Sequence, residues 1–562
     1  MEYSRVVELS SKNGSKYLIT CALPYANGPL HLGHIRSTYL PGDIYARYER
    51  LAGNDVLFVC ATDEHGTPIV AAAEKAGKPP AEFAKYYYER DKQEFEKLGF
   101  SFDIFYRTSS PENRELAQHF FAKLKENGHI YEREVSQAYC EKDKRFLPDR
   151  FVVGTCPHCS AQGQYSDYCD SCGKALTAGE ILDPKCIHCG TTPTTKTSKH
   201  YFFRLSAFSQ KLSDYLKGNK ELQPAVTNYV LNWIDKGLAD WDITRDLEWG
   251  VPVPGEKNMV FYVWFDAPIG YMSSTVKLLG SREKFNERWR DSKIVHFIGK
   301  DIIYHHFLFW PAMISGTGEF KLPEAIPVRG YLNLQGRKFS KSKNWFVSLE
   351  DYLNAFPPDY LRYYVTCITP HTVEDADFYW KDFADKVNNE LVASIGNYVH
   401  RTLTLIKRNS NSKIPEIKEA ELDEKDKEIL TRITSTKTRV SELLEKYEIK
   451  TGLEEILGLS GSLNQYLSAR EPWKDKDAAR VARTLYVCTR GITALSVLLY
   501  PYLPFSCEKL FGLLHLDAKR INWDDADKEL LKGGTEIGEI APLFAKVSDE
   551  QVAEQEAKLG GS

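Results

Sequence analysis

The N-terminal part of the chain alternates between short apolar segments and longer helical segments, and this order constrains the fold more than any other feature. The apolar, β-branched segments are SKYLITCALPY at 15–25 and NDVLFVCATDEHG at 54–66, and each ends in turn or polar residues. Segments with helical character follow at 43–53 and 79–100. Because strands that alternate with helices are typical of parallel sheets, we expect an α/β fold with a Rossmann-like, doubly wound parallel sheet.

The alternation stops near residue 130 and resumes at NMVFYVWFDAPIGYM and SKIVHFIGKDIIYHHFLFWPAM, so we interpret the part between as an insertion. After residue 380 apolar residues recur every fourth position, from Phe383 to Leu403, which predicts one face of an amphipathic helix. The division that we expect is 1–115 and 236–330 for the halves of the α/β domain, 116–235 for the connective insertion, 331–385 for a loop-rich region, 386–530 for an all-α helix bundle, and 531–562 for a charged tail.

The composition supports sizeable hydrophobic cores and argues against several classes of protein. Hydrophobic residues make up 43% of the chain and aromatic residues 12%, which argues against wholesale disorder. The net charge of −4 excludes a surface coated in basic charge, although local clusters of lysine and arginine still suffice to bind phosphates. No run approaches the ~18 apolar residues of a membrane span, and the first residues lack a signal pattern. We expect a cytoplasmic protein that does not bind membranes.

The clearest local motif is a pair of CxxC turns. Cys156 and Cys159 are followed, after nine residues, by Cys169 and Cys172. Two such turns at this spacing form a tetrahedral thiolate cage for Zn²⁺, and four thiolates leave no open position for a substrate. The sequence therefore predicts a structural zinc site in a zinc-binding connective insertion.

A third CxxC pair, Cys186 and Cys189, lacks an obvious partner. The nearby candidate is Cys140 with Asp143, which have CxxC spacing with the second cysteine replaced. Zn²⁺ accepts carboxylate oxygen, so a second site with three cysteines and one aspartate is chemically reasonable. Whether this second site holds zinc stays open.

Two further segments point to phosphates. His31 and His34 lie one turn apart around Gly33, where the chain leaves an apolar strand and opens a helix. This is either an ordinary strand–loop–helix crossing or a phosphate site, because the first turn of a helix presents unpaired N–H groups. The second segment is GRKFSKSKNW at 336–345, which is either a solvated basic loop or a mobile clamp that neutralises a triphosphate with Lys338 and Lys341.

Together, HLGH, KFSKS and the zinc insertion between them resemble the class I aminoacyl-tRNA synthetases, whose signatures are HIGH and KMSKS. Phe339 stands where that motif usually has methionine. The resemblance implies that 331–385 is a KMSKS-loop and stem-contact region and that Mg²⁺ accompanies ATP. The residues that it implies for ATP binding are His31, Gly33, His34, Lys338, Ser340, Lys341 and Ser342, with both histidines and both lysines in catalytic roles.

Among these enzymes, CALPYANGPLHLGH, ATDEHGTP, FYVWFDAPIGYM and FIGKDIIYHH are similar to the methionyl-tRNA synthetases, over nearly the whole chain. The resemblance implies a methionine–tRNA ligase of the archaeal and eukaryotic type. An aromatic apolar slot suits a thioether, since sulfur gains from ring contacts, and Asp63 supplies a charge for the ammonium group. The methionine-binding residues that it implies are Ala22, Leu23, Tyr25, Asp63, Trp264, Ala267, Pro268, Tyr271, Ile302 and His306.

The resemblance also assigns the helix bundle to the CAU anticodon. Asn397 and Arg401 lie four residues apart and off the apolar stripe, and Trp473 on a later helix offers an aromatic face for an unstacked base. The expected partners are ATP, L-methionine and initiator and elongator tRNA(Met). Since the sequence given carries no C-terminal oligonucleotide-binding domain of the kind that dimerises some relatives, we expect a monomer, with room for a tRNA-binding partner in trans.

Three alternatives are weaker. A leucyl-, isoleucyl- or valyl-type enzyme needs a large editing domain, for which the insertion of roughly 120 residues has no room. A cysteinyl enzyme would place zinc in the amino-acid pocket, whereas these cysteines lie outside the α/β halves. An inactive RNA-binding relative would have no need of intact HLGH, KFSKS and Asp63.

Overall fold

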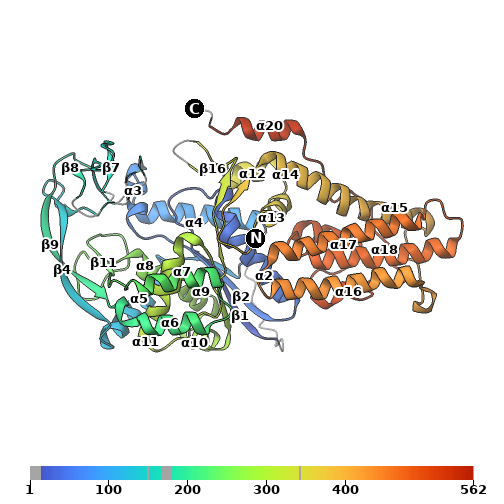
Figure 1. Cartoon of the computed structure of the whole chain (residues 1–562), viewed down its shortest axis with the longest axis horizontal. Helices are drawn as coiled ribbons and strands as arrows, with labels where there is room; N and C mark the ends of the chain where they lie inside the picture. The colour runs from blue at the N-terminus through green and yellow to red at the C-terminus, as the bar shows by residue number, and fades with distance from the viewer. Residues whose placement is uncertain are drawn as a thin grey trace.

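A parallel sheet forms the centre of the computed structural model, which describes residues 14–148, 151–166, 169, 171–172, 174, 176, 180–340 and 344–560 (Figure 1). Its strands, in spatial order, are β14 (Val328–Arg329), β13 (Lys293–Gly299), β1 (Lys16–Cys21), β2 (Asp55–Thr62) and β3 (Ile104–Arg107). Every neighbouring pair is parallel. This confirms the predicted parallel α/β sheet.

Helices cover both faces of the sheet because alternate strand residues belong to different cores. Ile19 and Phe58 pack in one core, together with residues of α2 (Leu40–Leu51). Leu18 and Val59 pack in the other core. The helices of that second face are α5 (Pro111–Glu126), α9 (Ile269–Leu279) and α11 (Trp310–Thr317). Buried side chains on both faces are what a doubly wound sheet requires.

The insertion is a long antiparallel ribbon that carries a small sheet at its tip (Figure 1). Strands β4 (Ile130–Cys140) and β9 (Thr194–Phe203) pair over ten residues, flanked by β5 (Arg145–Phe146) and β10 (Trp241–Asp242). The tip sheet contains β6 (Val152–Thr155), β7 (Gln164–Tyr165) and β8 (Leu182–Cys186). The chain returns to the α/β domain through α6 (Ser209–Gly218) and α7 (Pro224–Asp235).

The expectation of a loop-rich region after residue 331 was wrong. Strands β15 (Leu332–Leu334) and β16 (Arg337–Lys338) form a hairpin, and β15 also pairs in parallel with β17 (Ala376–Phe378). Two helices, α12 (Leu349–Ala355) and α13 (Pro358–Cys367), lie between them. Most residues of α13 are buried, among them Asp359 and Arg362, so charged residues do not mark an exposed face in its sequence.

The helix predicted from 383 to 403 exists, but its middle is a π-helix. It runs through α14 (Trp380–Lys386), the π-helical segment Val387–Gly396 and α15 (Asn397–Asn409). All six apolar residues of the predicted stripe are buried. A spacing of four overshoots the ~3.6-residue turn of an α-helix, and the wider π-helical turn compensates, so the stripe stays on one face.

The remaining helices form the bundle, and the C-terminal segment returns toward the sheet (Figure 1). The bundle helices are α16 (Glu424–Leu444), α17 (Ile449–Arg470), α18 (Ala478–Leu499) and α19 (Pro504–Leu513), whereas α20 (Asp549–Ala557) lies apart from them and contacts α14 (Figure 1). Up to residue 560 the segment expected as a charged tail is packed: Phe544 and Val547 are buried, and Gln335 donates to Glu556 at 2.7 Å. Among the described residues, no helix combines the length and apolar character of a membrane span.

Candidate active site

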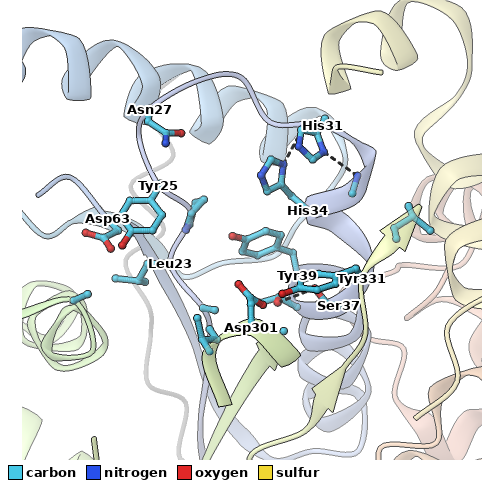
Figure 2. A pocket seen from close by; sticks show the side chains of 18 of the residues that line it. Leu23, Tyr25, Asn27, His31, His34, Ser37, Tyr39, Asp63, Asp301 and Tyr331 are labelled. Carbon is cyan, nitrogen blue, oxygen red and sulfur yellow. Dashed lines mark hydrogen bonds between the residues drawn. The ribbon is translucent and has the colours of Figure 1, made fainter. Parts of the chain in front are cut away.

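A cavity of about 670 Å³ opens at the carboxyl ends of the central strands (Figure 2). Tyr25 follows β1, Asp63 follows β2 and Asp301 follows β13, and all three line the cavity. Ligands of open parallel sheets bind at this edge, where the loops after neighbouring strands converge. The fold therefore builds the cavity from segments that are far apart in sequence.

The HLGH segment forms one wall and begins a helix there. His31 is the N-terminal cap of the short helix α1 (Leu32–His34), which continues through the π-helical turn Ile35–Tyr39 into α2. The Gly33 N–H donates to His31 Nδ1 at 3.1 Å, and the His31 N–H donates to His34 Nδ1 at 3.0 Å (Figure 2). A Cβ on Gly33 would lie 2.9 Å from the His31 ring, so this close approach requires glycine. Both histidines thus become part of the helix start beside the cavity.

The KFSKS segment reaches the same cavity from the hairpin of β15 and β16. Lys338 and Phe339 line it, and the Phe339 ring stacks on His31 with centroids 4.7 Å apart and planes 8° from parallel. Ser340 pairs through its backbone with Trp345 and is not among the lining residues. Lys341 and Ser342 lie outside the described residues. The two signature segments, some 300 residues apart in sequence, are therefore neighbours in space.

All the residues that the sequence assigned to methionine line this one cavity. Tyr271 donates its hydroxyl hydrogen to His306 Nε2 at 2.8 Å, and Trp264 stacks on His305 at 3.7 Å. Burial lowers the pKa of His306 to about 4, so its ring is neutral and its Nδ1–H donates to the Ile302 carbonyl at 3.1 Å. The walls are therefore aromatic and carry little charge.

Asp63 is the one carboxylic acid in the predicted methionine set. Its side chain is 2% exposed, and no hydrogen-bond partner lies within reach of Oδ1 among the described residues. Burial, and after it the nearby carboxylates of Asp266 and Glu64, raises the pKa of Asp63 well above its ordinary value, although the His65 N–H opposes this. A buried carboxylate in such surroundings favours a cationic ligand.

Several cavity residues were not singled out from the sequence. Asp301, beside the end of β13, is the most informative because Gly299 accommodates its carboxylate: a Cβ on Gly299 would lie 2.5 Å from Asp301 Oδ1. The Gly-Lys-Asp sequence after a buried strand is the one signal that could have found it. Tyr331 also lines the cavity (Figure 2). Single loop residues of this kind form no periodic pattern in the sequence. The other lining residues without a prediction are Pro24, Asn27, Gly28, Ser37, Thr38, Tyr39, Gly299, Leu332 and Asn333.

Two clusters at the tip of the insertion bring metal-binding side chains together. The ligand atoms of Cys156, Cys159, Cys169 and Cys172 all lie within 4.8 Å of one another, and those of Cys140, Asp143, Cys186 and Cys189 do the same. In the first cluster the Sγ–Sγ distance is 3.6 Å between Cys159 and Cys169. In the second, Asp143 Oδ2 lies 3.1 Å from Cys186 Sγ. Each cluster is compact enough for four ligands around one Zn²⁺ at ~2.3 Å from sulfur.

The three residues expected at the anticodon lie on the helix bundle. Asn397 is exposed at the start of α15, and Arg401 follows one turn later. Trp473, in the turn between α17 and α18, is 37% exposed, and the Arg401 guanidinium lies 4.9 Å from its ring centroid. The structure thus places Arg401 and Trp473 side by side on a partly exposed surface.

Comparison with known proteins gives one consistent answer. The family of class I tRNA synthetases (M) matches residues 17–403, and the anticodon-binding domain of methionyl-tRNA ligase matches residues 414–562. The methionine–tRNA ligase of Methanopyrus kandleri is 44% identical over 559 residues, covering 97% of this chain and 82% of that protein. The methionine–tRNA ligase of Methanocaldococcus jannaschii is 45% identical over 546 residues, covering 97% and 81%.

A solved structure agrees with the sequence relatives. The methionyl-tRNA synthetase of Mycobacterium tuberculosis, in complex with methionyl-adenylate, superposes with a TM-score of 0.79 at 28% identity, covering 94% of this chain and 99% of that one. The family predicted from HLGH, KFSKS and the pocket segments is therefore confirmed. This chain belongs to the methionine–tRNA ligases, a family of class I aminoacyl-tRNA synthetases.

Proposed function

We propose that the cavity is the site at which this chain, as a methionine–tRNA ligase, joins methionine to ATP. The observation that carries the proposal is that the whole predicted methionine set lines the same cavity as His31, Gly33, His34 and Lys338. An amino-acid pocket and a phosphate-binding helix start that share one cavity suit a reaction between a carboxylate and a nucleotide.

In this proposal methionine lies along the aromatic wall with its ammonium group on Asp63. Trp264 and Tyr271 offer ring contacts to the thioether sulfur, and the neutral His306 adds no competing charge. The ammonium group supplies the positive charge that the buried carboxylate lacks. Selectivity for methionine follows because its unbranched side chain fits an apolar slot that offers a single charge partner.

Adenylate formation then needs positioning and charge stabilisation. A methionine carboxylate oxygen attacks the α-phosphorus of ATP, and the bond to pyrophosphate breaks, so that methionyl-adenylate and pyrophosphate form. The helix start at His31 and the lysine clamp of Lys338 and Lys341 stabilise the charge that builds on the phosphates. Mg²⁺ enters with ATP. No covalent intermediate with the protein is required.

Transfer to tRNA follows in the same cavity. A hydroxyl oxygen of the terminal adenosine attacks the methionyl carbonyl, and AMP leaves. We assign the CAU anticodon to Asn397, Arg401 and Trp473, because a tryptophan face beside a guanidinium suits an unstacked base. Initiator and elongator tRNA(Met) are the proposed substrates, and 331–385 is the proposed stem-contact region of the predicted domain division. We further propose that the chain acts as a monomer in the cytoplasm, where a separate tRNA-binding partner could join it.

Zn²⁺ is the proposed cofactor of the insertion. The four cysteines Cys156, Cys159, Cys169 and Cys172 would hold one ion, and a closed thiolate cage supplies rigidity to the tip. The donor set of Cys140, Asp143, Cys186 and Cys189 fits a second ion, since its four ligand atoms also converge. Both sites would serve structure, because none of their ligand residues lines the cavity.

The test is exchange of labelled pyrophosphate into ATP, measured with each of the twenty amino acids and without tRNA. Exchange that depends on methionine alone is the expected result. Exchange with a different amino acid would overturn the pocket assignment, and exchange with none would overturn the proposed activity. Omitting tRNA keeps the outcome independent of the anticodon assignment.

A further inference from the structure

Three consecutive residues after β2 project toward three different neighbours. Asp63 lines the cavity. Glu64 accepts hydrogen bonds from Arg107 at 2.8 Å, at the end of β3. His65, which is 3% exposed, contacts Asp266 Oδ2 through Nδ1 at 2.7 Å. The proposed function uses Asp63 only, so the buried contact of His65 needs its own explanation.

Asp266 belongs to the opposite wall of the pocket. It ends the short helix α8 (Val263–Asp266), two residues after Trp264 and directly before Ala267 and Pro268. Its side chain is fully buried. The contact with His65 therefore joins the segment that carries Asp63 to the turn that carries three other pocket residues.

A chain of hydrogen bonds holds Asp266 in place from the other side. Asn113 Nδ2 donates to Asp266 Oδ2 at 3.3 Å, and Ser273 Oγ donates to Asn113 Oδ1 at 2.9 Å. Asn113 is on α5 and Ser273 is on α9, and both are buried. The carboxylate that His65 contacts is thus anchored to two helices of the core.

The segment around His65 is also fixed by packing. Trp249 Nε1 donates to the Glu64 carbonyl at 2.6 Å, and its ring lies edge-on to the His65 ring at 5.5 Å. Gly66 has φ of +93°, and a Cβ there would lie 3.2 Å from the Val263 side chain. The turn after β2 therefore rests directly on α8.

From these contacts we propose that His65 is a positioning residue for methionine, and that its pairing with Asp266 fixes Asp63 against the wall formed by Trp264, Ala267 and Pro268. The proposal rests on the proposed methionine site. Loss of His65 would leave a buried carboxylate without its imidazole partner and would remove the side-chain link between the turn that carries Asp63 and α8. A small displacement of a binding group is expensive in a preorganised site, whereas the helix start at His31 would be unaffected.

The experiment measures binding of labelled methionine by equilibrium dialysis without ATP, and KM for ATP by exchange at saturating methionine. His65→Ala is expected to raise the methionine Kd by ~10-fold or more and to leave the KM for ATP within about twofold. His65→Asn is expected to restore most of the affinity, because its amide N–H lies near the position of Nδ1. His119→Ala is the matched control: His119 contacts Glu319 at 2.5 Å, but the pair is exposed.

Two results would overturn the proposal: an unchanged methionine Kd in His65→Ala, or equal losses for methionine and ATP. If His65→Ala fails to fold, Asn113→Ala becomes the test, because it removes the other support of Asp266. A methionine Kd that rises severalfold with the KM for ATP unchanged supports the proposal, and an unchanged Kd refutes it. A wild-type protein that binds no methionine would instead contradict the proposed function.

Discussion

His200 should make the stability of the connective insertion depend on pH. The side chain is 1% exposed on β9, with Nδ1 2.7 Å from Asp242 Oδ2 and Nε2 2.9 Å from Asp246 Oδ2. Burial alone lowers the pKa of His200, but the hydrogen bonds to Asp242 and then Asp246 outweigh burial and raise the pKa to about 9. Arg245 lies between the two aspartates in sequence and reaches Asp242 at 3.5 Å, so it competes for one carboxylate.

The magnitude follows from the interval between the two pKa values. The pKa of His200 rises from its ordinary value of 6.5 to about 9. At ~1.36 kcal/mol for each pH unit, the interaction of the charged ring contributes about 3.4 kcal/mol. The carboxylates are 22% and 15% exposed, and solvent screening reduces the contribution to about 2 kcal/mol. Since the folded pKa is raised, this stability is fully present below pH 6.5 and is lost as the pH rises through 9.

The perturbation is His200→Gln, and the assay is calorimetric Tm at pH values from 6 to 10. At pH 6 the variant should melt about 4 °C below the wild type, and the gap should close as the pH passes 9. His400→Gln, at an exposed histidine of α15, serves as the control and should show no such gap. A gap that stays constant across the range, or widens toward high pH, would refute the reasoning.

The other predictions concern the site and the tRNA surface. Asp63→Asn should raise the KM for methionine in pyrophosphate exchange by roughly 100-fold, since a neutral amide no longer attracts the ammonium group, and an unchanged KM would contradict its role. Lys338→Ala should lower the exchange kcat by ~100-fold with methionine binding intact, as equilibrium dialysis can check. Trp473→Ala should raise the KM for tRNA(Met) while exchange without tRNA stays at the wild-type rate. Chelation should release one or two Zn²⁺ per chain, counted by mass spectrometry. It should lower the Tm of the insertion more than the Tm of the core.

The sheet and the pocket could be predicted because their signals are local. β1 and β2 are buried on both faces, so each reads as a short apolar run. The residues that follow such runs meet at one edge of the sheet, and it was the resemblance to the methionyl-tRNA synthetases that assigned Asp63 and Tyr25 to one pocket. The cysteine clusters were predictable for a similar reason, because their spacing encodes their geometry.

Other features depend on contacts between distant residues and leave no local pattern. In the helix α13 even the charged side chains Asp359 and Arg362 are buried, because they meet the distant residues Ser506 and Asp43. The pair formed by His65 and Asp266 joins positions that are 201 residues apart, and nothing near either residue specifies the other. Asp301 follows the end of a strand, but a single carboxylate in a loop forms no spaced motif that would identify it from the sequence.

The two signature segments meet through an aromatic contact between Phe339 and His31. His31 and Phe339 meet through stacked rings, with centroids 4.7 Å apart. An ion pair at the same place would use a carboxylate, which would repel phosphates from the helix start. In the proposed function, the exposed Lys338 at the cavity wall directs its charge to the phosphates of the nucleotide, and the neighbouring aromatic contact does not compete for that charge. Phe339, where methionine is usual in the motif, serves this purpose because its flat face matches the His31 ring.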